Sequence, residues 1–205
     1  METIETVEEL IESYQKLPGI GPKTAERLAY ATLSLSVEDR ESFCNALQNS
    51  IHRVSRCPEC GTFYEDRCPI CSNPNRDSSL LMVVSDSKDI IAIEKSGSYN
   101  GLYFTLDGTL SPVKNRTPDS IGIPELKQTV ASKGVHEIIL ALPTDLEGET
   151  TSLFIINSFS KNNDVTVTRL AHGIPIGTNL EYIDSLTLAQ SIKGRVSTKG
   201  DKGNE

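Results

Sequence analysis

The sequence contains no tryptophan, and aromatic residues make up only 5% of its 205 positions. Stacking of nucleic-acid bases on exposed rings is therefore not expected to be its main mode of binding. A long apolar run is also missing, and residues 1–5 are acidic rather than basic or apolar. We therefore expect neither a signal peptide nor a membrane span, and we expect the protein in the cytoplasm.

An excess of basic residues is absent too. The chain has 20 Lys and Arg against 28 Asp and Glu, which gives a formal net charge of −8. A generally basic surface is excluded, so any contact with nucleic acid must be local. The phosphate-binding loop Gly-x-x-x-x-Gly-Lys-Ser/Thr does not occur. An ATPase is therefore not expected.

Cysteine is scarce, but four of the five cysteines are grouped. They form two Cys-x-x-Cys pairs on either side of a seven-residue loop: Cys57, Cys60, Cys68 and Cys71. Four thiolates in such turns can complete a tetrahedral zinc shell without an open position, so we expect one structural zinc ion per chain. The alternative, a redox dithiol, needs only one pair and an electropositive setting. The fifth cysteine, Cys44, is expected to be a buried helix residue.

Residues 17–29, Leu-Pro-Gly-Ile-Gly-Pro-Lys-Thr-Ala-Glu-Arg-Leu-Ala, predict a turn between two helices. We expect helices over residues 4–16, 22–33 and about 37–54. The glycines allow close approach of a ligand backbone, and free N–H groups at the start of the second helix can bind a phosphate oxygen. The residues expected to contact DNA, without reading its sequence, are Gly19, Gly21, Lys23, Thr24 and Arg27. The alternative is an ordinary helical hairpin with solvated basic side chains.

From residue 80 onward, short apolar runs alternate with helical stretches. Strands are expected over residues 80–84, 102–106, 137–142 and 165–170, and helices over 88–95, 124–133, 150–160 and 185–193. Strand alternating with helix is typical of an α/β fold with a parallel sheet covered on both faces.

Acidic residues follow two of the predicted strands. They are Asp86 after the first strand and Asp145, Glu147 and Glu149 after the third. These positions fall at the carboxyl edge of a parallel sheet, where α/β folds place their sites, and grouped carboxylates can hold Mg²⁺. The alternative is a solvated loop of an acidic protein.

These features, in this order, resemble the RecR family of bacterial recombination mediators. The resemblance covers nearly the whole chain and is most specific over residues 169–188, Arg-Leu-Ala-His-Gly-Ile-Pro-Ile-Gly-Thr-Asn-Leu-Glu-Tyr-Ile-Asp-Ser-Leu-Thr-Leu. It implies five parts: a helix–hairpin–helix region (1–55), a zinc ribbon (56–77), a Toprim-like domain (78–172), a carboxyl-terminal assembly segment (173–198) and a flexible tail (199–205).

The resemblance also implies a role without enzymatic activity. Members of the family form ring-like tetramers that can encircle single- or double-stranded DNA. With RecO, and in some cases RecF, they load recombinase onto gapped DNA at the nucleoid. The acidic edge of the Toprim-like domain, Asp86, Asp145, Glu147 and Glu149, is then expected to bind the partner. Ser85 stands where the family usually has the glutamate that Toprim enzymes use as an acid or base. The alternative is a magnesium-dependent nuclease or a primase-like enzyme.

Overall fold

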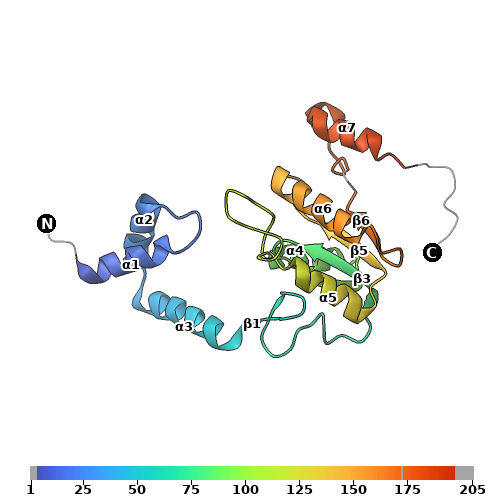
Figure 1. Cartoon of the computed structure of the whole chain (residues 1–205). Helices are drawn as coiled ribbons and strands as arrows, with labels where there is room; N and C mark the ends of the chain where they lie inside the picture. The colour runs from blue at the N-terminus through green and yellow to red at the C-terminus, as the bar shows by residue number, and fades with distance from the viewer. Residues whose placement is uncertain (1–3, 172, 197–205) are drawn as a thin grey trace. The chain divides into compact units, whose positions relative to one another are not determined.

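The computed structural model describes residues 4–171 and 173–196 of the chain. The chain divides into two compact units, with the boundary between Ser55 and Arg56. The predicted flexible tail (199–205) lies outside the described residues. Each unit is described by itself below, with the element labels of Figure 1.

The first unit is built from three helices, all of which were predicted. They are α1 (Glu5–Gln15), α2 (Pro22–Leu33) and α3 (Val37–Arg53). Proline occupies the first turn of α2, where a missing N–H group costs no hydrogen bond. The first two helices pack around Val7, Ala25 and Ala29, and the hydroxyls of Tyr14 and Thr32 lie 2.6 Å apart. The small alanines allow the two helices to approach closely.

Helix α3 begins after Ser36, whose hydroxyl accepts a hydrogen bond from the N–H of Asp39. No residue of α3 is buried. The prediction that Cys44 is buried is therefore wrong: its side chain is exposed. The apolar spacing that favoured burial is present, but α3 has no packing partner for this face among the described residues.

The second unit contains a parallel sheet with the strand order β4-β3-β5-β6. The strands are β3 (Asp77–Val84), β4 (Gly101–Thr105), β5 (Glu137–Ala141) and β6 (Thr166–Arg169). All three neighbouring pairs are parallel, and Val84 at the end of β3 is in register with Thr105 and Ala141. The predicted α/β fold and its parallel sheet are thereby confirmed.

Helices cover the first face of this sheet, as predicted. Helices α5 (Ile123–Lys133) and α6 (Leu146–Phe159) are labelled in Figure 1. They contribute Leu126, Val130 and Ile155 to a core cluster that also contains side chains of β3, β4 and β5.

The cover of the second face is shared between a helix and the cysteine segment. Helix α4 (Ser87–Ser96) contributes Ile90, which clusters with Met82, Val84 and Tyr103 of the sheet. The same cluster contains Cys57, Cys60, Cys68 and Ile70. The cysteine segment contains the short strands β1 (Ser55–Arg56) and β2 (Phe63–Tyr64). Together with α4, this segment covers the second face of the sheet.

Helix α6 begins four residues earlier than the predicted start at residue 150. Asp145 is its N-cap, and the Asp145 carboxylate accepts a hydrogen bond of 2.8 Å from the N–H of Gly148. Glu147 and Glu149 therefore lie in the first helical turn rather than in an extended loop.

The carboxyl-terminal part of the described chain carries the short helix η1 (Leu180–Tyr182) and α7 (Ser185–Lys193), the latter with the predicted bounds. Asp184 caps α7 by accepting from the N–H of Thr187. No residue of either helix is buried. Among the described helices, none is both long enough and apolar enough to pass through a lipid bilayer.

Candidate functional site

The four grouped cysteines converge on one point. Their sulfur atoms all lie within 4.8 Å of one another. The Sγ atoms of Cys57 and Cys71 are 3.8 Å apart, and those of Cys60 and Cys68 are 3.5 Å apart. A tetrahedral zinc shell with Zn–S bonds of about 2.3 Å places its sulfur atoms about 3.8 Å apart. The geometry and the all-thiol donor set therefore fit a zinc site.

The environments of Cys60 and Cys68 shift their pKa values in opposite directions. The interaction with the Cys71 thiol lowers the pKa of Cys60 to about 5, whereas burial raises the pKa of Cys68. Without a cation, four neighbouring thiols cannot all lose their protons cheaply, because the resulting negative charges repel each other. A bound divalent ion removes this penalty and makes all four groups ligands.

The first Cys-x-x-Cys turn is also held by the α/β domain. Thr105, at the end of β4, donates a hydrogen bond of 2.7 Å from its hydroxyl to the carbonyl of Cys60. The ammonium of Lys133, at the end of α5, lies 2.5 Å from the carboxylate of Glu59. Gly61, which has a φ of +80°, sits so close to Thr105 that an added Cβ would lie 2.6 Å from the Thr105 side chain. The turn is thus packed tightly against the sheet.

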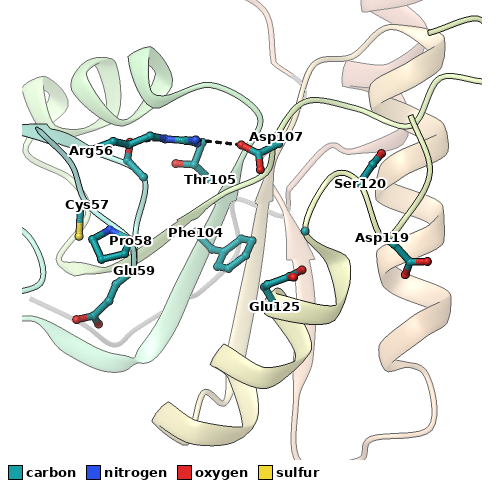
Figure 2. Close-up of a pocket in the computed structure, with 12 residues that line it drawn as sticks. Arg56, Cys57, Pro58, Glu59, Phe104, Thr105, Asp107, Asp119, Ser120 and Glu125 are labelled. Carbon is teal, nitrogen blue, oxygen red and sulfur yellow. Dashed lines mark hydrogen bonds and ion pairs between the residues drawn. The ribbon is translucent and has the colours of Figure 1, made fainter. Parts of the chain in front are cut away.

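A pocket of about 310 Å³ lies at this junction. Figure 2 shows Cys57, Pro58 and Glu59 on one side and Phe104 and Glu125 of the α/β domain on the other. Arg56 and Asp107 form an ion pair of 3.0 Å across it. The pocket therefore marks the junction between the cysteine segment and the sheet.

The predicted DNA-contacting residues lie together at the turn between α1 and α2. Gly19 has a φ of +81°, a backbone conformation that favours glycine. Gly21 is different: its φ is −83°, and no described atom lies within 4 Å of the position of a Cβ. Neither the backbone of Gly21 nor its surroundings require glycine, so the missing side chain leaves open space at the start of α2.

The N-terminus of α2 is available to an anion. No side chain caps this helix. Pro22 has no N–H, and the N–H of Thr24 donates to the carbonyl of Gly21. Lys23 therefore supplies the first-turn N–H at the positive end of the helix dipole. Lys23 and Arg27 are exposed on successive turns of α2, and within the described chain neither side chain makes an ion pair or a hydrogen bond. Thr24 is half-buried in the same first turn.

The predicted acidic edge does not form a metal site. Asp86 and Asp145 accept hydrogen bonds from backbone N–H groups as the caps of α4 and α6. Glu149 pairs with Arg169 at 2.6 Å. In the described parts of the chain, the four cysteines are the one group of three or more His, Cys, Asp or Glu side chains close enough to share an ion. Partner binding by this edge remains a prediction.

Glu147 fastens a long loop to the start of α6. Its carboxylate accepts from the hydroxyls of Ser111 at 2.7 Å and Thr109 at 3.1 Å, and it pairs with Lys114 at 3.0 Å. The hydrogen bond from Ser111, followed by that from Lys114, lowers the pKa of Glu147. Sequence reasoning missed these partners because they come from an irregular loop, whose path no periodicity indicates.

A second unpredicted group is a largely buried ion pair. Arg76, whose side chain is only 9% exposed, donates to Glu94 of α4 at 2.9 Å and to the carbonyl of Gly101. Tyr103 donates its hydroxyl to the same carboxylate at 2.6 Å. The hydrogen bond from Arg76 lowers the pKa of Glu94. These contacts fix the chain where it leaves the cysteine segment and enters β3.

Comparison with protein families gives three matches along the chain. Residues 7–51 match the RecR helix-hairpin-helix model, residues 79–171 the Toprim domain and residues 173–196 the RecR C-terminal model. Among curated proteins, recombination protein RecR of Staphylococcus saprophyticus subsp. saprophyticus is 44% identical over 192 residues, which is 93% of this chain and 96% of the relative. The protein of the same name from Staphylococcus aureus strain JH9 matches with the same identity and coverage.

Proposed function

Because the chain belongs to the RecR family of recombination proteins, we propose that it is a non-enzymatic mediator of recombinational DNA repair. It binds DNA without sequence specificity and, together with RecO and in some cases RecF, helps to load recombinase onto gapped single-stranded DNA at the nucleoid. RecO and RecF are inferred from the family resemblance. We assign their binding surface to the acidic edge of the Toprim domain.

The observation that carries the DNA-binding role is the open start of α2. Within residues 4–171 and 173–196, open space at Gly21, an uncapped helix N-terminus and the unpaired Lys23 and Arg27 occur together. Backbone N–H groups and two cations can hold phosphate oxygens, but they cannot distinguish bases. This combination supports binding that depends on the DNA backbone alone.

The cysteine cluster supports one structural zinc ion per chain. Four thiolates leave no ligand position for water or substrate, so the ion would not take part in a reaction. At the sheet edge, Asp86 and Asp145 cap helices, whereas Glu147 and Glu149 form ion pairs. The magnesium-dependent nuclease or primase-like alternative would use such carboxylates as metal ligands instead.

Self-association into a ring-like homotetramer is supported by apolar surface. Phe43, Leu47 and Ile51 are exposed along α3, Ile51 by 75%. In the carboxyl-terminal segment, Ile176, Tyr182 and Leu186 are exposed as well. Monomeric proteins seldom leave several large apolar side chains together in water, and we assign these two surfaces to contacts with further copies of the chain.

The double variant Lys23→Glu, Arg27→Glu is expected to bind DNA of any sequence at least about tenfold more weakly. Each lost phosphate contact should also reduce the slope of log K against log salt concentration by about 0.9. Binding is measured by fluorescence anisotropy at several salt concentrations on gapped, single-stranded and duplex DNA. The matched control is Lys127→Glu, a charge reversal at an exposed site on α5.

The same incubations contain Mg²⁺ and are then resolved on a denaturing gel. Intact strands together with a uniform loss of affinity in the double variant are expected. A loss confined to one DNA sequence would contradict the backbone-only mode of binding. Magnesium-dependent cleavage or extension of strands would contradict the mediator role and support the enzymatic alternative.

The double variant Leu47→Asp, Ile51→Asp is expected to lower the oligomeric state, because it places two charges on the apolar face of α3. Sedimentation velocity measures the mass of the assembly, and helix content is compared by circular dichroism. Thr6→Asp, a charge at an exposed site on α1, is the control. An unchanged assembly in the α3 variant would remove this face from the interface.

A further inference from the structure

We propose that Lys133 and Thr105 of the α/β domain are positioning residues of the zinc site, and that zinc cannot leave until their contacts with the first Cys-x-x-Cys turn have opened. The inference rests on the proposed zinc site and goes beyond its four ligands. Lys133 lies 74 residues from its partner Glu59, and Thr105 lies 45 residues from Cys60. Neither residue belongs to the cysteine segment.

The two contacts act on different parts of the same turn. Glu59 lies between the ligands Cys57 and Cys60, so the ion pair with Lys133 fixes the middle of the turn. Thr105 holds the carbonyl of Cys60, so it fixes the second ligand directly. The backbone on either side of these points has little freedom, because Pro58 before Glu59 has a restricted φ and Gly61 after Cys60 is closely packed against Thr105.

The second pair of cysteines does not depend on the α/β domain in this way. The N–H of Cys71 donates to the sulfur of Cys68 at 3.4 Å, and both the N–H and the hydroxyl of Ser72 donate to the carbonyl of Cys68. All of these groups lie within the cysteine segment itself. Cys68 and Ile70 also pack against the sheet. The first pair differs because its turn is also held by a hydrogen bond from Thr105 and an ion pair with Lys133.

Lys133 also acts through its positive charge, which faces the carboxylate of Glu59. Four thiolates around a divalent ion leave two net negative charges, and Glu59 adds a third beside them. The Lys133 side chain is 33% exposed and that of Glu59 52%, so water screens their attraction in part. If Lys133 is replaced by a neutral residue, the negative charge of Glu59 next to the thiolates is no longer compensated. We expect the thiolates then to hold the ion more weakly.

Zinc release from the full-length protein tests this assignment. The isolated protein is mixed with the chromogenic chelator 4-(2-pyridylazo)resorcinol, and the transfer of zinc is followed by absorbance. Residues that support metal ligands from behind typically change metal affinity by 10–100-fold. We expect release from Lys133→Met and from Thr105→Val to be faster by about this factor.

Matched variants separate positioning from a general loss of structure. Thr105→Ser keeps the hydroxyl and should release zinc at nearly the wild-type rate. Lys127→Met removes a charge from the same helix without touching the cysteine segment and should have no effect. Adding Glu59→Gln to Lys133→Met removes the uncompensated carboxylate and should recover part of the lost retention, although the positional contact is still missing.

The order of opening gives a second readout. N-ethylmaleimide alkylation followed by mass spectrometry should show faster labelling of Cys57 and Cys60 than of Cys68 and Cys71 in Lys133→Met. Equal release rates in wild type, Lys133→Met and Thr105→Val would overturn the inference and leave the zinc site intact. A wild-type protein that holds no zinc would overturn the zinc site itself, which is a different result.

Discussion

Removal of zinc is expected to unfold the Toprim domain together with the cysteine segment, while the helices of the first unit remain folded. The family resemblance implies a zinc ribbon (56–77) separate from the Toprim-like domain (78–172). In the structure, however, Cys57, Cys60 and Cys68 share one apolar cluster with Met82, Val84 and Tyr103 of the sheet. Without the ion, the thiolates would repel each other, or the protonated thiols would lose their fixed geometry. Either change would disturb the packing against this face of the sheet.

The expected effect is large. Structural zinc contributes on the order of 10–16 kcal/mol in zinc-finger peptides at neutral pH, and a typical domain is stable by only about 5–15 kcal/mol. Even a fraction of the zinc contribution is therefore comparable with the stability of a whole domain. The Toprim domain should therefore lose its cooperative unfolding transition when zinc is removed by a chelator or by Cys60→Ser.

Hydrogen exchange with mass spectrometry resolves this outcome along the chain. Peptides from β3 and β4 should lose protection in the zinc-free protein, whereas peptides from α1 and α2 should keep it. Cys44→Ser is the matched control, since Cys44 is exposed on α3 and lies in the other unit. Full protection of β3 and β4 without zinc would show that the sheet is stable without an ordered cysteine segment.

Substitution of Gly148 by alanine is expected to have the second large effect. A Cβ at this position would lie 2.0 Å from the carbonyl oxygen of Pro143, which is a backbone atom and cannot rotate away. The start of α6 would have to move, and with it the N-cap bond from Gly148 to Asp145. Overpacking of this kind typically costs 1–3 kcal/mol, and a contact with backbone should reach at least about 3 kcal/mol.

Urea denaturation followed by circular dichroism measures this loss as a change in the midpoint and in the free energy of unfolding. Gly173→Ala is the control, because its φ is not in the left-handed region and no described atom lies within 4 Å of its Cβ position. Movement of α6 should also release the loop that Glu147 holds, so trypsin should cleave after Lys114 sooner. Unchanged stability of Gly148→Ala would mean that the turn before α6 can relax without cost.

Local signals in the sequence predicted much of this fold. Pro22 correctly marks the start of α2, the bounds of α7 are as predicted, and each expected strand has a counterpart. The four cysteines were identified as one cluster because ligand spacing within each turn is a short-range property. In these cases the residues that specify the structure are neighbours in the chain.

The misses have two causes: a local capping signal that was interpreted as a loop, and contacts between residues far apart in the chain. The start of α6 was placed too late because the acidic residues were interpreted as a loop, although Asp145 is an N-cap. Cys44 was expected inside because helical spacing shows that a face is apolar but not what covers it. The partners of Glu147 and the contact of Lys133 with Glu59 depend on the path of a loop and on the packing of a helix 74 residues away.

The strand order has a consequence for biosynthesis. A chain leaves the ribosome from its N-terminus, so all four cysteines are synthesised before Thr105 and Lys133. Strand β3, which follows the cysteines directly, lies between β4 and β5 and has no partner strand until these later segments emerge. A zinc ion captured early would at first be held by the cysteine segment alone. Tight retention would begin only when translation has passed α5 and β5 and the sheet can close around β3.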